Sequence, residues 1–83
     1  MHLERFDEGI AALDAAIEIQ PDFHSTYYNK ACTYSKMKNK ESMLANLTKA
    51  IELESSWRDN AKEDPDFESY RDDPDFRKLV GLD

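Results

Sequence analysis

Few side chains in this sequence could act as nucleophiles or as metal ligands. There is one cysteine, Cys32, and there are two histidines, His2 and His24. A cysteine nucleophile needs a nearby histidine base held by Asp or Asn, and zinc needs several His or Cys ligands at short spacing. Neither arrangement is present, and a lone cysteine allows no disulfide within the chain. We therefore expect no catalysis, no metal and no other cofactor.

An acid–proline motif, Asp-Pro-Asp-Phe, occurs twice near the C-terminus, at residues 64–67 and 73–76. A calcium loop would need alternating oxygen ligands and a closing glutamate, which this motif lacks. Aspartate followed by proline is instead typical of a helix start, with the aspartate as N-cap. The motif predicts short helices over about 65–70 and 74–80, with Phe67 and Phe76 packed on the preceding helices.

The composition predicts one small helical domain. The 83 residues are 40% apolar and 35% charged, with only two glycines. The net charge of −7 argues against nucleic acid as the main partner. No apolar run reaches the length of a membrane span, and no signal peptide is recognisable, so we expect a cytoplasmic protein.

The charge is distributed unevenly along the chain. Residues 1–23 carry six acids and one arginine, residues 24–51 carry five lysines and one glutamate, and residues 52–83 carry eleven acids and five bases. A basic middle between acidic ends could attract an acidic peptide. The alternative is that these lysines form an ordinary solvated turn and helix face.

Apolar residues at intervals of three and four predict three longer helices, over residues 3–19, 23–37 and 40–53. Asn39 is a plausible cap of the third helix, and either Asp22 or Ser25 could cap the second. A short helix over about 56–63 follows, with Ser55 or Ser56 as its cap. We expect Ala31 and Ala50 at helix–helix contacts. The side chains expected to be largely buried are those of Leu13, Tyr34 and Leu47.

The first and third predicted helices match each other when the sequence is shifted by 34 residues. Leu13 then aligns with Leu47, and Ala16-Ile17-Glu18-Ile19 aligns with Ala50-Ile51-Glu52-Leu53. Gly9 aligns with Met43, and Pro21 with Ser55. This offset equals the period of one known helical repeat, so the match indicates two copies of one unit.

Residues 23–56 resemble the tetratricopeptide repeat, a helix–turn–helix unit with the pattern W-x2-L-G-x2-Y, then A-x3-F, then P. The positions that carry the resemblance are Tyr27, Ala31, Tyr34, Leu47 and Ala50; the departures are Lys30, Met43 and Ser55. The resemblance implies an all-α fold, a short antiparallel helix–turn–helix solenoid. We divide the single domain of residues 1–83 into a half repeat (1–22), a complete repeat (23–56) and a C-terminal short-helix cap (57–83).

The resemblance also implies a function, that of a non-catalytic module binding a peptide or helix of a partner protein in the groove lined by the front helices. The groove positions here are Ser25, Tyr28, Asn29, Cys32, Ser35 and Lys36. Asn29 stands where repeats that clamp a peptide carboxylate place an asparagine, although asparagine is also common there in repeats with other partners. The alternative is a purely structural cap of a longer solenoid, or a self-associating unit without a separate ligand.

The first helix has no front helix of its own in this sequence. Its apolar stripe would therefore be covered on one side only, and exposed apolar patches mark interfaces. We expect a homodimer through residues 3–19, with two-fold pairing as the commonest closed arrangement. The competing expectation is a monomer whose C-terminal helices fold across the gap.

Overall fold

The computed structural model describes residues 5–82, and every regular element in that part of the chain is helical. This confirms the all-α class. The elements in chain order are α1 (Phe6–Ile19), α2 (His24–Lys36), α3 (Lys40–Leu53), α4 (Trp57–Glu63), the 3₁₀ helix η1 (Pro65–Tyr70) and α5 (Pro74–Val80). Residues 3 and 4 of the first predicted helix lie outside the described residues.

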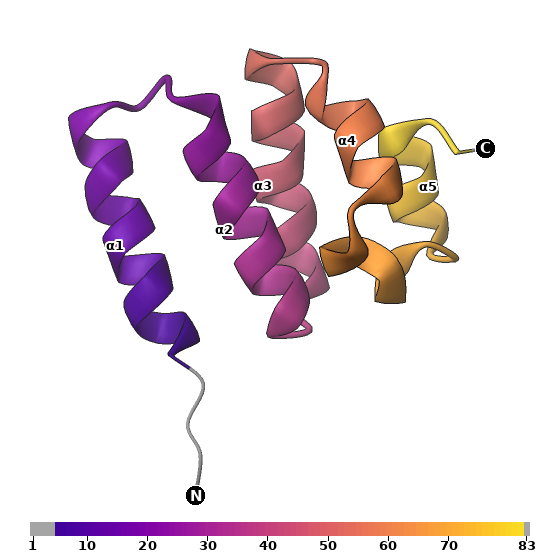
Figure 1. Cartoon of the computed structure of the whole chain (residues 1–83), viewed down its shortest axis with the longest axis horizontal. Coiled ribbons are helices and arrows are strands. Elements are labelled where there is room, and N and C mark those ends of the chain that lie inside the picture. The colour runs from indigo at the N-terminus through magenta and orange to yellow at the C-terminus, as the bar shows by residue number, and fades with distance from the viewer. Residues whose placement is uncertain (1–4, 83) are drawn as a thin grey trace, which may run out of the picture.

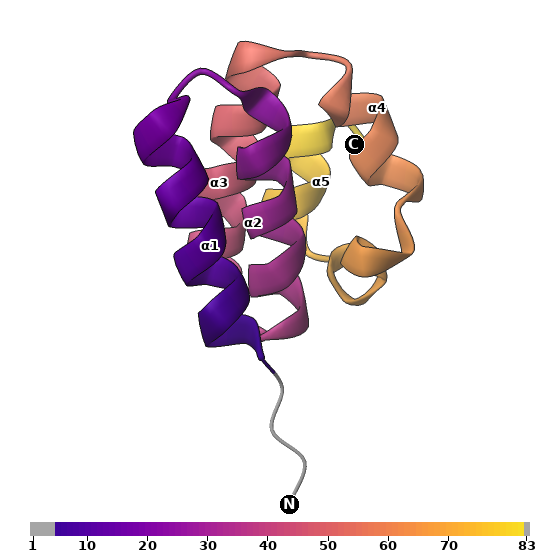
Figure 2. The ribbon, with the colours of Figure 1, turned by 60° about the vertical axis from the view of Figure 1, so that its left-hand side comes forward.

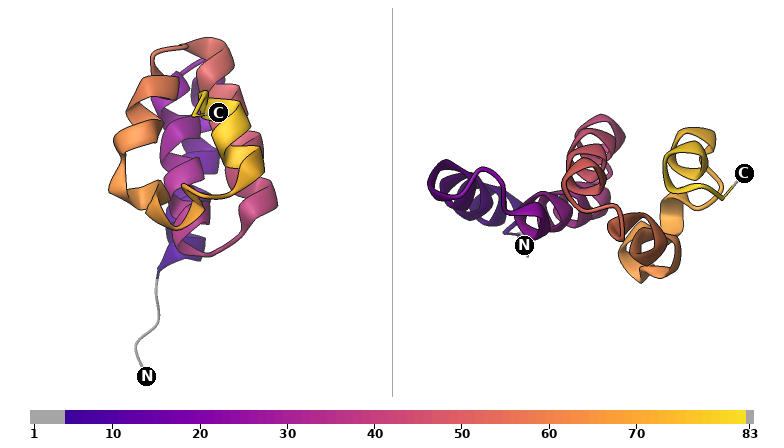
Figure 3. Two further views of the ribbon diagram at one scale, coloured as in Figure 1. Left: turned by 90° about the vertical axis from the view of Figure 1, so that its right-hand side faces the viewer. Right: turned by 90° about the horizontal axis from the view of Figure 1, so that it is seen from above.

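The helices stand side by side in a row that follows the order of the chain (Figure 1). The long helices α1, α2 and α3 run antiparallel to their neighbours, as the view in Figure 2 also shows. Seen from above, α2 and α4 occupy one side of the row while α3 and α5 occupy the other (Figure 3). The helix α1 is therefore one end of the molecule, and the segment α4–η1–α5, here called the tail, is the other.

The helix starts show which sequence-based capping assignments hold. The Asn39 side chain accepts a hydrogen bond from the Ser42 backbone N–H at 3.2 Å, which confirms the cap of α3. The cap expected for α2 is wrong, because Phe23 occupies that position and no side chain caps the helix. Asp22 lies in the preceding turn, and Ser25 already belongs to the first helical turn, so neither can serve.

The tail helices begin at the two acid–proline motifs, as predicted. Asp64 accepts a hydrogen bond from the Asp66 N–H at 2.9 Å, and Asp73 accepts from Asp75 N–H at 2.9 Å. Gly81 ends α5 at φ 83°, a left-handed conformation that glycine adopts without strain. At the start of α4 the Ser56 hydroxyl donates to the Glu54 carboxylate instead of capping the helix.

The core lies between α2, α3 and the tail. Its fully buried side chains are those of Tyr28, Ala31, Met43, Leu47, Ala50, Ile51, Ala61, Phe67, Phe76 and Val80. The predicted burial of Leu47 is confirmed. Ala31 and Ala50, expected at helix–helix contacts, and Phe67 and Phe76, expected to pack on the preceding helices, all belong to the buried core. Leu13 and Tyr34 are only half-buried, which corrects the expectation for both. Leu13 is partly exposed because its helix, α1, packs mainly on α2. Tyr34 is partly exposed because it packs at the edge of the core.

Candidate partner-binding face

The six residues predicted to line a groove all lie on α2, and they differ in exposure. Asn29 and Lys36 are exposed, while Ser25 and Cys32 are partly covered. The remaining two, Tyr28 and Ser35, are only 4% and 3% exposed. The helix therefore brings the six onto neighbouring turns, but they do not share one environment.

Tyr28 is enclosed by four residues of the tail. Its ring stacks on Trp57 with centroids 4.1 Å apart and meets the edge of Phe67 at 5.6 Å. Its hydroxyl donates to the Asp64 carboxylate at 2.7 Å and accepts from the Asn60 amide at 2.9 Å. Burial, and then the hydrogen bond to Asp64, raise the pKa of Tyr28 far above its usual value. The phenol therefore stays protonated and holds the tail against α2.

Ser35, in the last turn of α2, makes a second connection between α2 and the tail. Its hydroxyl donates to the backbone carbonyl of Asp66 at 2.6 Å. The neighbouring Lys36 ammonium lies 3.7 Å from the Asp66 carboxylate, a long and largely exposed ion pair. Because η1 is bonded to α2 in this way, Ser35 is an internal contact of the folded chain.

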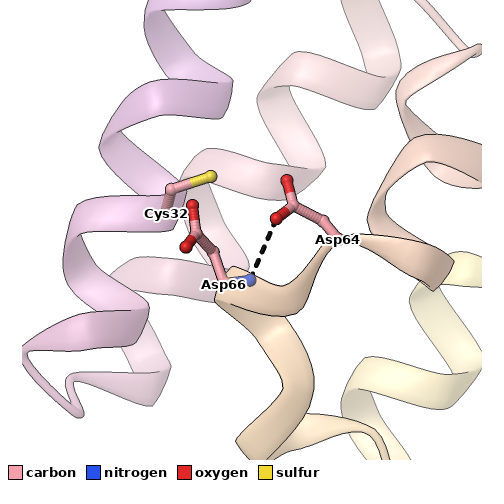
Figure 4. A group of neighbouring side chains, drawn as sticks. All are labelled: Cys32, Asp64 and Asp66. Atoms are coloured by element: carbon pink, nitrogen blue, oxygen red, sulfur yellow. Dashed lines mark hydrogen bonds between the residues drawn. The ribbon is translucent and has the colours of Figure 1, made fainter.

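Cys32 lies between these two connections, and its sulfur faces the carboxylates of Asp64 and Asp66 (Figure 4). The three groups offer atoms within 4.8 Å of one another, which is close enough to hold a metal ion. However, Asp64 already accepts hydrogen bonds from Tyr28 and from the Asp66 N–H. Burial, and then the charges of both aspartates, raise the pKa of the Cys32 thiol. We therefore assign this cluster to the docking of the tail.

A hollow of about 430 Å³ opens where α4 passes the start of α2. The Trp57 indole N–H donates to His24 Nδ1 at 2.8 Å and forms part of the wall. The other lining residues are Glu54, Ser56, Asp59, Asn60 and Glu63. Sequence reasoning missed this hollow because its walls are 33 residues apart in the chain and meet only through tertiary packing. The one available signal was a single tryptophan among acidic residues.

The comparison with known families agrees with this architecture. The family described as tetratricopeptide repeat matches residues 1–23 and again residues 24–56, which together are more than half of the chain. The chain therefore belongs to the tetratricopeptide-repeat family, as a short array followed by additional helices. Repeats of this family generally serve as protein-interaction modules and are typically non-catalytic. Searches of curated proteins and of solved structures returned no match. No helix among the described residues has the length and apolarity needed to cross a membrane.

Proposed function

We propose that this chain is a non-catalytic interaction module that binds a peptide or helix of a partner protein along the open part of α2. The observation that supports this most strongly is the exposure of Asn29 and Lys36, on a helix otherwise packed against α1, α3 and the tail. Ser25 and Cys32, partly covered, border them. Tyr28, Cys32 and Ser35 face the tail and would reach a partner only after the tail had left α2, so we assign recognition to the other three positions.

The chemistry of this surface favours a partner with carboxylates. The Lys36 side chain is 54% exposed, and its 3.7 Å contact with Asp66 is too long and too solvated to hold it strongly. The Asn29 amide can donate two hydrogen bonds to a carboxylate or a backbone carbonyl. Lys30, one residue further along, is already paired with Asp14 at 2.6 Å and is largely covered. The free cysteine is consistent with a reducing, cytoplasmic setting, which we include in the proposal.

A peptide-display selection on the intact chain tests this proposal. Peptides recovered from a random library would be titrated by fluorescence anisotropy against the wild type, Asn29→Ala and Lys36→Glu. We expect both variants to weaken binding, with Lys36→Glu weakening acidic peptides most. Lys78→Glu is the matched control, because Lys78 is exposed on α5 at the far end of the row. Peptides that bind all four proteins equally, or a library without binders, would contradict the proposal and favour a purely structural role.

Self-association through α1 is the second candidate function. The observation in its favour is that α1 contains no fully buried residue and leaves Ile19 80% exposed. A symmetric homodimer would cover this apolar surface, for which residues 3–19 are the predicted contact. Sedimentation equilibrium at micromolar concentration would show a dimer that Ile19→Glu dissociates. A single species of 9.7 kDa would exclude it.

A further inference from the structure

The end helix α1 has an apolar side that no described element covers. Gly9, Leu13 and Ala16 are half-buried, while Met43, Leu47 and Ala50, which lie 34 residues later at the same repeat positions, are fully buried. The difference has a simple cause, since α3 packs against α2 and the tail whereas α1 packs mainly against α2 (Figure 1). The helix α1 thus has the residue pattern of α3, but among the described elements it lacks a neighbour on its second side.

The covered and uncovered sides of α1 can be distinguished. Asp14 accepts a 2.6 Å charged hydrogen bond from Lys30, so its side of the helix faces α2. The uncovered side carries Ala12 and Ile19, both exposed, and the half-buried Gly9 and Ala16 lie beside them on the same stripe of the helix. An added Cβ at Gly9 would meet nothing within 4 Å, and this notch leaves room for the backbone of another helix to approach closely.

The stripe ends in larger apolar groups. Ile19 is 80% exposed, and Phe23, just after the helix, is 50% exposed. Both belong to a hollow of about 390 Å³ formed by residues 19–23 at the turn between α1 and α2. A large apolar side chain can enter such a hollow, which makes this turn the natural anchor point for a docked element.

Charge distinguishes between the possible occupants of this side. Residues 5–23 contain five carboxylates and one arginine, Arg5, whose own contact with Glu8 is a long, exposed 3.7 Å pair. Only Asp14 is neutralised by α2. A second copy of α1 would bring the same excess of negative charge, and like charges facing each other oppose association. A helix whose apolar stripe is flanked by Lys and Arg would bury the same surface and gain attraction.

We propose that the uncovered side of α1 docks an amphipathic helix of another protein, with an apolar stripe flanked by basic residues. This rests on the proposed function only in its general class, protein binding, because it uses a different surface from α2 and an opposite partner charge. On this side of α1 it replaces the homodimer, which the like charges of two α1 helices oppose. The expected partner of α2 is acidic, while that of α1 is basic.

The test uses the whole chain and a synthetic helix of about 18 residues, long enough to be partly helical alone, with a Leu/Ala stripe flanked by Lys and Arg. One control peptide replaces each Lys and Arg by Glu, and a second has the same composition in scrambled order. Titration calorimetry should show that only the basic amphipathic peptide binds well, and that 0.5 M salt, where the screening length is well below 10 Å, weakens it.

Three variants locate the binding. Glu8→Lys should weaken the basic peptide by about fivefold, because Glu8 is exposed on the side of α1 away from Asp14, while Glu52→Lys, on the exposed surface of α3, should leave binding unchanged. Ile19→Glu should abolish most of it. Gly9→Gln should block close approach without unfolding α1, because glutamine favours helix more than glycine does and its site is open. Circular dichroism would confirm that each variant is folded.

Equal effects of Glu8→Lys and Glu52→Lys, equal binding of the three peptides, or an Ile19-dependent dimer of the chain would each overturn the proposal. The α2 variants Asn29→Ala and Lys36→Glu should bind the basic peptide as the wild type does. The two proposals can therefore fail separately. The α2 variants test only the binding of acidic peptides to α2, and the α1 variants test only the binding of the basic helix to α1.

Discussion

The helices α1 and α3 have nearly the same pattern of residues but different burial. Leu47 is fully buried in α3, while Leu13, at the same repeat position in α1, is half-buried. The same holds for Ile51, which is 6% exposed, and its counterpart Ile17. An amphipathic helix therefore supplies an apolar stripe, but the neighbours on both of its sides determine how much of that stripe is buried.

The tail accounts for the difference in burial between α1 and α3. It closes the α2–α3 pair on the side away from α1, through Phe67 and Phe76, both without exposed surface. No described element does the same for the outer side of α1. Two polar-to-polar connections, at Tyr28 and Ser35, hold the tail in register on α2. Within residues 5–82, the tail therefore covers one end of the array, and no described element covers the other.

Phe67→Ala should lower the free energy of unfolding most, because it would remove part of the tail's cover over α2 and α3. The ring packs against Tyr28 and Phe76 with centroids 5.6 Å away in each case. Loss of a fully buried phenylalanine typically costs about 3–5 kcal/mol of unfolding free energy, a large part of the stability of a small domain. Urea unfolding followed by tryptophan fluorescence measures it. Deletion of residues 64–83 should be at least as severe, and a truncated chain of unchanged stability would show that the tail does not support the core.

A matched pair of leucine truncations should measure how much more the side-chain burial in α3 stabilises the fold than that in α1. Leu47→Ala removes a fully buried side chain and should cost about 2–5 kcal/mol. Leu13→Ala removes a half-buried one and should cost about 1 kcal/mol, since less apolar surface and no closed cavity are involved. Both values come from the same denaturant titration. Equal losses would mean that α1 is as well covered as α3 and that its outer side is not an open face.

The smallest effect concerns the start of α3. The Lys40 ammonium contacts the Asp73 and Asp75 carboxylates of the tail at 2.8 and 3.0 Å. The hydrogen bond from Lys40, and then those from the Phe76 and Asp75 N–H groups, hold the pKa of Asp73 below its usual range. Such a group stabilises the fold above its unfolded pKa of about 3.9, and the contribution is lost as the pH falls through the lower folded value.

Asp73→Asn keeps an N-cap oxygen but removes the charge, so it isolates this pair. The variant should be less stable than the wild type at pH 7, and the difference should shrink as the pH falls below about 4. Melting temperatures measured from pH 7 to pH 2 test this. A difference that stays constant over the whole range would show that the Lys40–Asp73 pair does not contribute. The corresponding position in α1 is Phe6, which has no charge to pair.

Much of the fold could be predicted from sequence because it depends on local rules. The apolar period predicts α3 to the residue, and the acid–proline motif predicts the starts of η1 and α5. The start of α2 could not be predicted in the same way. Asp22 and Ser25 both suit a cap chemically, yet the turn after Pro21 places Phe23 at that position. Capping depends on backbone geometry within one or two residues, which composition does not specify.

For the candidate site, too, local sequence predicted one part and tertiary contacts decided the rest. The sequence placed six residues on one helix, and helical geometry alone brings them onto neighbouring turns. It could not show that Asp64 and Asn60 bind the Tyr28 hydroxyl, or that Asp66 binds Ser35, because these partners lie more than 30 residues away. Those contacts decide which of the six remain available.

The sequence by itself determined the helices, their approximate ends and the 34-residue period that relates α1 to α3, because these follow from side-chain pattern and local backbone preference. Only the tertiary structure decided what each helix face meets. Burial is a property of neighbours: Leu13 and Leu47 are the same residue at the same repeat position, yet α3 is packed between α2 and the tail while α1 has α2 as its main neighbour. Chain folding brings the tail to one end of the row, and no described element covers the outer side of α1 at the other end.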